Sequence, residues 1–223
     1  MTESDLILSV NKPIGWTSFD VVNKLRRALR WKAVGHAGTL DPPADGVLIV
    51  LCGNATRRSA EFMELRKEYR ARIRFGLATN TDDLTGEIIS HSGTEGWSRD
   101  AIRHAMREFV GEIAQVPPQV SAVKVGGKRS YAAARAGRSL ELKPRTVVVY
   151  SFDLLTAAEP EIEVNLICAR GTYVRAIARD LGARLGWGGT LSRLTRTAVG
   201  PYHVEHALTL DSVLKRSREF APD

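Results

Sequence analysis

Alternation of apolar and polar side chains in two stretches is the feature that most constrains the fold of this chain. Residues 67–75 direct Tyr69 and three further apolar side chains to one side and arginines to the other. Residues 162–168 repeat the pattern. Because successive side chains of a strand point to opposite faces of a sheet, each stretch is predicted to be a half-buried strand. Helices are then needed to cover the apolar face.

The other stretches have the apolar spacing of helices or the short apolar runs of buried strands. They alternate irregularly, which predicts a single mixed domain of strands and helices. We expect further strands at Leu6–Val10, Val47–Leu51 and Thr146–Leu155, a loop from Gly35 to Gly46, and helices from Thr17 or Ser18 to about Arg30, from Ser98 to Gly111, from Ser130 to Gly137, from Gly171 to Leu185 and from Asp211 to Arg218.

Length and composition favour a globular cytoplasmic protein. The chain has 223 residues, of which 43% are hydrophobic, so it can fill a core. Its first apolar run, Leu6–Leu8, follows an acidic stretch, which predicts neither a signal peptide nor a membrane-spanning helix. Cys52 and Cys168 lie too far apart in the sequence for a disulfide framework and have no zinc-site spacing.

Positive charge is concentrated in one part of the chain. The whole chain has a formal net charge of +7. Residues 24–74 contain twelve Lys and Arg but five Asp and Glu, which gives this stretch the same charge of +7. Clustered cations suit a polyanion, because each neutralised phosphate releases bound counterions. Nucleic acid is therefore a candidate partner, and a solvated basic helix or strand face is the alternative.

The sequence contains no common cofactor motif. Gly127–Lys128 lacks the flanking residues of a phosphate-binding loop, and no dinucleotide, zinc-protease or serine-hydrolase motif is present. The densest local signal is Gly35–Pro42, where Asp41 precedes a proline in the predicted loop. A carboxylate held by stiff backbone can act as a nucleophile or a general base. The alternative is a simple Asp-Pro turn.

An ordered series of motifs resembles the TruB-type tRNA pseudouridine synthases, which isomerise a uridine in the T-loop of tRNA. Lys12–Ser18 resembles that family's first motif, KPxGxTS, and Gly35–Pro42 resembles its catalytic signature, GHxGTLDP. Later matches are a KxY motif at Lys67–Tyr69, a central block from Gln115 to Arg135, the block from Gly171 to Gly182, and Leu194 with Arg196.

The resemblance implies a fold and a domain organisation. The family's α+β pseudouridine synthase fold has a central, mixed, mostly antiparallel sheet flanked by helices and loops. The matching motifs span almost the whole chain, from Leu8 to Gly200. We therefore expect residues 1–223 to be a single catalytic domain without the C-terminal RNA-binding PUA domain that many members carry.

The resemblance also implies roles for individual residues. Asp41 would be the nucleophile that attacks the uridine, at its ribose or its ring, so that the base can detach, rotate and rejoin through carbon. Arg175 would pair with Asp41 and orient it, and Tyr69 would stack on the target base. His36 would fill the space that the flipped base leaves. The reaction needs no metal and no cofactor, because it exchanges one glycosidic bond for another without redox change.

Further positions are expected to contact the RNA. Lys12 and Leu194 resemble pocket-lining residues of the family, and Tyr173 is either a pocket residue or a core residue. Arg70 and Arg72 are predicted to contact phosphates of the T-arm. The expected partner is therefore tRNA, through its T-arm stem-loop, bound by a monomer that has no membrane partner.

Two residues depart from the family pattern. Asp45 stands where the family usually has a small or hydroxylated residue, and Thr195 replaces an arginine. An RNA-folding chaperone, which binds and flips the T-loop without catalysis, is an alternative function. A glycoside-cleaving enzyme is another, and it needs a second carboxylate about 5–10 Å from Asp41, for which Asp45 is the candidate nearby in sequence.

Overall fold

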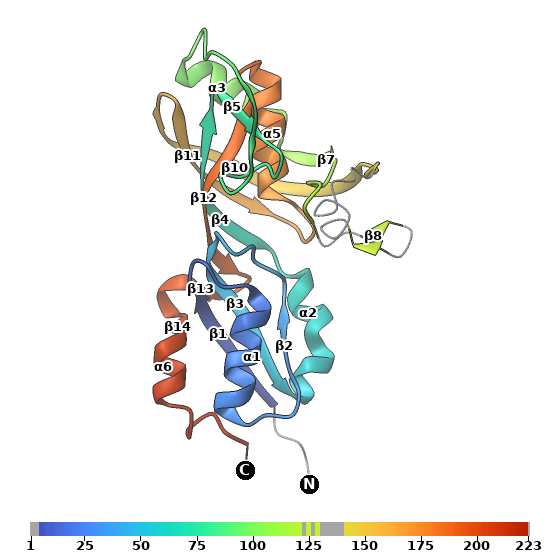
Figure 1. Ribbon diagram of the computed structural model, residues 1–223, viewed down its shortest axis with the longest axis vertical. Helices are drawn as coiled ribbons and strands as arrows, with labels where there is room; N and C mark the ends of the chain where they lie inside the picture. Colours follow the sequence, from blue (N-terminus) through green and yellow to red (C-terminus); the bar gives the residue numbers. More distant parts are fainter. Residues whose placement is uncertain (1–4, 122–123, 126–127, 130–140, 223) are drawn as a thin grey trace. The chain divides into compact units, whose positions relative to one another are not determined.

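The computed structural model describes residues 5–121, 124–125, 128–129 and 141–222 (Figure 1). Contacts between Cα atoms divide the chain into two compact units, one of residues 1–69 and 194–223 and the other of residues 70–193. Strands β4 (Lys67–Phe75) and β12 (Gly189–Val199) supply residues to both units. Each unit combines a sheet with helices, which confirms the mixed α+β class expected from the sequence.

The first unit is built on a mixed sheet with the strand order β14-β1-β3-β12. β1 (Asp5–Lys12) and β3 (Asp45–Gly53) are antiparallel neighbours, whereas β12 is parallel to β3. The other strands are β2 (Val34–Ala37), antiparallel to β3, β13 (Tyr202–His203), antiparallel to β12, and β14 (Leu208–Thr209), parallel to β1.

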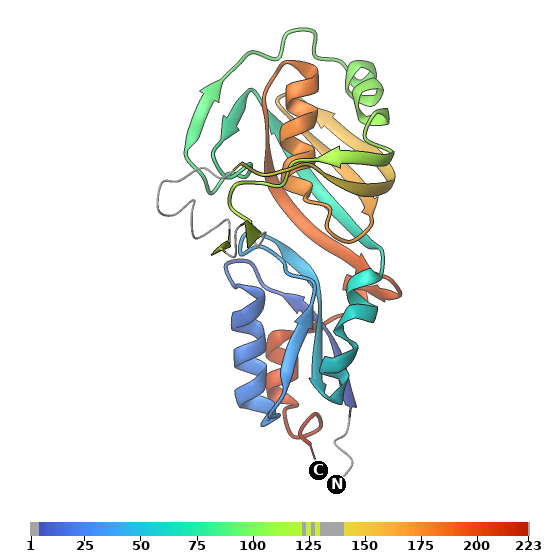
Figure 2. The same cartoon turned by 90° about the vertical axis from the view of Figure 1, so that its right-hand side faces the viewer.

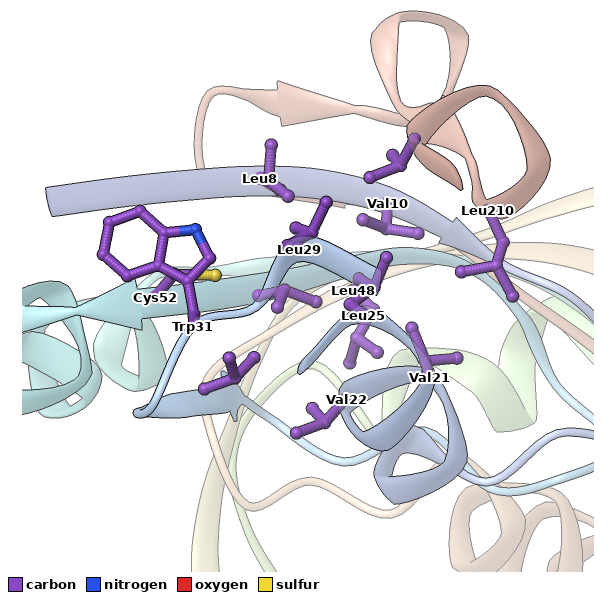
Figure 3. Close-up of a cluster of buried hydrophobic side chains, with 13 residues drawn as sticks. Leu8, Val10, Val21, Val22, Leu25, Leu29, Trp31, Leu48, Cys52 and Leu210 are labelled. Carbon is purple, nitrogen blue, oxygen red and sulfur yellow. The ribbon is translucent and has the colours of Figure 1, made fainter. Parts of the chain in front are cut away.

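Helices cover both faces of this sheet. α1 (Ser18–Leu29) and α6 (Leu210–Lys215) lie side by side on one face (Figures 1 and 2), where their apolar side chains surround Leu48 (Figure 3). On the opposite face, Phe62 of α2 (Ser59–Glu64) shares a core with alternate residues of β3. β3 is thus buried on both faces, as its uninterrupted apolar run predicts. Short 3-10 helices, η1 (Asn54–Arg58) and η2 (Val204–His206), complete the unit.

The start of α1 is fixed by a reciprocal capping box. The Thr17 hydroxyl accepts a hydrogen bond from the Asp20 backbone at 3.0 Å, and the Asp20 carboxylate accepts one from the Thr17 backbone at 2.9 Å. These bonds satisfy backbone N–H groups that the first helical turn leaves free. The predicted helix and its buried stripe are confirmed, and Ser18 at its start is buried.

The second unit has the strand order β4-β11-β10-β7. β10 (Arg145–Ala158) is antiparallel to both β11 (Glu161–Cys168) and β7 (Gly111–Gln115). β4 and β11 alternate buried with less buried side chains, which confirms the two half-buried strands. Two further strand pairs are β5 (Leu77–Thr79) with β6 (Ile88–His91) and β8 (Lys124–Val125) with β9 (Lys128–Arg129). The helices of this unit, α3 (Arg99–Arg107) and α5 (Val174–Leu185), contact each other.

Some predicted boundaries are wrong. The loop expected from Gly35 to Gly46 is only residues 38–44, because β2 runs to Ala37 and β3 begins at Asp45. A four-residue strand such as β2 is too short to show an alternating pattern. The helix expected to reach Gly111 ends at Arg107.

Several elements of the structure were not predicted from the sequence, among them α2, β7 and β12. The helix predicted at residues 130–137 lies outside the described residues. In the part of the chain that the structure describes, no helix is both long and apolar enough to span a lipid bilayer.

Candidate active site

The loop that carries Asp41 is held on both sides of this residue. On the N-terminal side, the buried Ser18 hydroxyl accepts a hydrogen bond from the Leu40 N–H at 2.9 Å and donates one to the Leu40 carbonyl at 3.1 Å. On the C-terminal side, the Pro42 carbonyl accepts a hydrogen bond from the Gly15 N–H at 2.8 Å. The half-buried Asp41 therefore projects from a backbone that has little freedom to move.

Lys12 is buried beside this loop and acts on it through backbone carbonyls. Its Nζ donates hydrogen bonds to the carbonyls of Trp16 at 2.7 Å, Pro13 at 3.0 Å and Pro42 at 3.4 Å. Burial lowers the pKa of Lys12 from 10.5 to about 8, although the carboxylates of Asp45 and Asp41 oppose the shift. Lys12 is thus a structural support of the Asp41 loop.

The two residues that depart from the family pattern contact each other. The Thr195 hydroxyl on β12 donates a hydrogen bond of 2.5 Å to the Asp45 carboxylate on β3, and the two residues are partners in the parallel ladder. Hydrogen bonds to a charged group are stronger than neutral ones. The two departures therefore form one coupled pair, which sequence spacing could not reveal.

His36 lies on β2, next to the residue that ends this strand before the loop at residues 38–44. Burial, and secondarily the charge of Arg196, lowers the pKa of this imidazole below its ordinary 6.5. The side chain is therefore neutral at pH 7. Its Nδ1 is buried and finds no hydrogen-bond partner among the described residues.

Tyr69 and Leu194 are both buried residues of the first unit. Tyr69 lies on β4, where it is 8% exposed on the apolar side of the alternating strand, as predicted. Leu194 on β12 is 9% exposed. Their roles in binding the target base stay predictions.

Arg175 lies in the first turn of α5 and is 5% exposed. Its guanidinium donates hydrogen bonds to the carbonyls of Thr81 at 2.9 Å and Val120 at 3.0 Å, and its Nε lies 3.7 Å from the Asp83 carboxylate. These partners all belong to the second unit, whereas Asp41 belongs to the first. The pairing of Arg175 with Asp41 stays a prediction.

Asp83 is a partner of Arg175 that the sequence reasoning missed. Its Oδ1 accepts hydrogen bonds from the Thr81 hydroxyl at 2.8 Å and from the Thr85 N–H at 3.0 Å, which leaves Oδ2 facing Arg175. The available signal was the dense run of Thr, Asn and Asp from Thr79 to Thr85, because such side chains bond nearby backbone in turns.

A second ion pair lies one helical turn further along α5. Arg179 contacts the Asp82 carboxylate at 2.9 Å. Burial raises the pKa of Asp82, and the charges of Arg179 and Arg175 oppose the shift. The adjacent residues Asp82 and Asp83 thus pair with Arg179 and Arg175, which lie one turn apart on α5.

Tyr173 precedes α5 and is held through its backbone. Its N–H donates to the Gln115 side-chain oxygen at 2.8 Å, and its carbonyl accepts from the Gln115 amide at 3.2 Å. Gln115 is 2% exposed, so this residue fixes the start of the helix from the core. The half-buried Tyr173 ring is compatible with either predicted role.

The cations predicted to contact RNA have different surroundings. Arg70 lies 2.7 Å from Glu163 and Arg72 lies 3.8 Å from Glu161, so carboxylates of β11 partly neutralise both. In the first unit, Lys24 and Arg27 line a pocket of about 410 Å³ together with Gly15, Trp16, Asp20 and Asn23. The charges of Arg70 and Arg72 are therefore less available to RNA than those of Lys24 and Arg27.

Comparisons with known proteins identify the family. Residues 26–174 match the TruB family pseudouridylate synthase N-terminal domain, and residues 175–220 match the tRNA pseudouridylate synthase B C-terminal domain. The chain belongs to the TruB family. The tRNA pseudouridine synthase B of Trichormus variabilis is 48% identical over 206 residues, which cover 91% of this chain and 70% of that protein. That of Thermobifida fusca is 47% identical over 218 residues, which cover 94% and 74%.

Solved structures of similar fold agree with membership of the TruB family. The crystal structure of a Cbf5-Nop10-Gar1 complex matches with a TM-score of 0.74 and 29% identity, over 97% of this chain and 59% of that chain. An H/ACA RNP bound to a substrate RNA containing 2′-deoxyuridine matches with a TM-score of 0.71 and 28% identity, over 94% and 52%. This chain thus spans little more than half of those chains. The pseudouridine synthase fold expected from the motifs is confirmed.

Proposed function

We propose that this chain is a tRNA pseudouridine synthase that converts the T-loop uridine at position 55 to pseudouridine. The observation that carries this proposal is that Asp41 projects from a loop held on both sides, by the buried Ser18 hydroxyl at Leu40 and by the Gly15 N–H at Pro42. Family membership and the names of the curated relatives support the same reaction.

The reaction is an exchange of glycosidic bonds. The bond between C1′ and N1 of the uridine breaks, the uracil turns, and a bond forms between C1′ and C5. The hydrogen on C5 leaves as a proton, and N1 takes one up. The Asp41 carboxylate attacks either C1′ or the ring and is released unchanged at the end. A nucleophile with a fixed backbone starts close to its attacking geometry.

Other residues of the site would prepare the RNA. A uridine inside a folded T-loop must be flipped out, at a cost of about a few kcal/mol. The neutral imidazole of His36 suits the place that the base vacates, because it can stack without bringing a charge. Tyr69 would stack on the flipped base, and Arg175 would orient the Asp41 carboxylate.

Tritium release from tRNA labelled at C5 of its uridines tests the proposal. The protein should release tritium from unmodified tRNA and leave pseudouridine at position 55, and a tRNA with cytidine at that position should release none. An RNA-folding chaperone would refold the tRNA without release, and a glycoside-cleaving enzyme would form free uracil. Either of those results would overturn the proposal.

A further inference from the structure

Arg196 on β12 has the largest fully buried side chain among the described residues, with 1% of its surface exposed. Within the same part of the chain, no carboxylate lies within 4.0 Å of its guanidinium. A buried charge without an ionic partner is strongly unfavourable unless other polar groups replace its water. The contacts that Arg196 makes should therefore matter to the protein.

Those contacts are with the backbone on both sides of Asp41. Nη2 donates a hydrogen bond to the Gly38 carbonyl at 3.0 Å, and Nη1 donates one to the Thr39 carbonyl at 3.4 Å. Nε donates one to the Val47 carbonyl at 2.7 Å. The planar guanidinium thus joins the segment before Asp41 to the strand that follows it.

Glycines make room for this arrangement. Gly46 is the ladder partner of Arg196 and has a φ of +104°, and a Cβ there would lie 2.2 Å from the Arg196 carbonyl oxygen. Gly38 has a φ of +96°, which favours glycine, although a Cβ there would make only an ordinary contact of 3.6 Å with Nη1. A side chain at Gly46 would push β12 away from β3 and move the guanidinium with it.

The contacts of Arg196 complete the support of the loop. Every carbonyl from Gly38 to Pro42 accepts a hydrogen bond, those of Gly38 and Thr39 from Arg196 and the other three from Ser18, the Ala44 N–H, Gly15 and Lys12. Without Arg196, the first two carbonyls of this series lose their donors. The backbone leading into Asp41 would then be free to shift.

We propose that Arg196 is a positioning residue, which holds the Gly38–Asp41 backbone so that the Asp41 carboxylate lies in its attacking orientation. This inference rests on the proposed function. Arg196 acts through the loop and not on the RNA, because its side chain is fully buried. Its loss should therefore slow the covalent step and leave RNA affinity unchanged.

Arg196→Met and Arg196→Lys test this inference against the control Leu29→Ala. Leu29 is fully buried in the core under α1, so its truncation destabilises the same unit without touching the loop. At saturating enzyme, Arg196→Met should lower the single-turnover isomerisation rate by about 10²-fold, as a misplacement of about 1 Å can do. Arg196→Lys should recover part of the loss, because an ammonium can reach some of the same carbonyls. Affinity for tRNA should stay at the wild-type value in all three variants.

Hydrogen exchange supplies a readout that does not need activity. The amides of Leu40, which is bonded to the Ser18 hydroxyl, and of Ala44, which is bonded to the Asp41 carbonyl, should exchange faster in Arg196→Met and not in Leu29→Ala. A rate loss no larger than that of Leu29→Ala, or a loss of tRNA affinity at an unchanged single-turnover rate, would overturn the inference. A wild-type protein without activity would overturn the proposed function instead. Hydrogen exchange would still show whether Arg196 holds the loop.

Discussion

Replacement of Lys12 by methionine should change how the stability of the protein depends on pH. In the folded protein the pKa of Lys12 is lowered from 10.5 to about 8, chiefly by burial, whereas the unfolded chain has the ordinary value. Between these two values the unfolded chain binds one more proton than the folded protein, so the contribution of Lys12 to stability rises with pH. The contribution is complete above pH 10.5 and is lost as the pH falls through 8. At about 1.4 kcal/mol per pH unit, the change over this window is about 3 kcal/mol.

Urea unfolding of the wild type and Lys12→Met, at intervals from about pH 7 to 11, measures this contribution. The difference between the two free energies of unfolding is the quantity to follow. Taking this difference cancels the contributions of groups that both proteins share. One such group is Cys52, whose thiol pKa is raised to about 11 by burial. The difference should shift by about 3 kcal/mol in favour of the wild type as the pH rises. A difference that stays constant across this range would refute the claim that burial lowers the pKa of Lys12.

The other predictions concern three separate parts of the structure. Asp83→Asn should lower stability by about 3 kcal/mol in a denaturant melt, because it leaves a buried guanidinium without its carboxylate, and an unchanged midpoint would contradict this. A double-mutant cycle with Asp45→Asn and Thr195→Val should give a coupling energy of about 1 kcal/mol, whereas additive effects would disprove the pair. Joint reversal of Lys24 and Arg27 to Glu should reduce the slope of log affinity for tRNA against log salt by about 2, and an identical slope would exclude phosphate contacts at this pocket.

The sequence predicts the loop that carries Asp41, but it does not predict which residues hold this loop through hydrogen bonds. Asp41 lies in a dense motif, so local spacing was enough to find it. Ser18 lies 22 residues from Leu40, and Arg196 lies 158 residues from Gly38. Such contacts depend on strand pairing and helix packing, which no local pattern encodes. The roles of Ser18 and Arg196 therefore emerge only from the fold.

Alternation likewise predicted which side chains are exposed but not what they contact. The pattern in β4 correctly placed Arg70 and Arg72 on the exposed side, and Tyr69 on the buried side. It could not show that Glu163 and Glu161 of the neighbouring strand lie opposite these arginines, because cross-strand register depends on the whole sheet. Arg175 was found from its motif, whereas its contact with the turn at Thr81, 94 residues away, was not predictable.

The most direct test of the central claim is tritium release from C5-labelled tRNA by the wild type, Asp41→Asn and the control Asp45→Asn. The amide introduced by Asp41→Asn keeps the size of the side chain but cannot act as an anionic nucleophile. Wild type and Asp45→Asn should release tritium, and Asp41→Asn should release none while binding tRNA with wild-type affinity. Release by Asp41→Asn at the wild-type rate would contradict the assignment of Asp41 as the nucleophile.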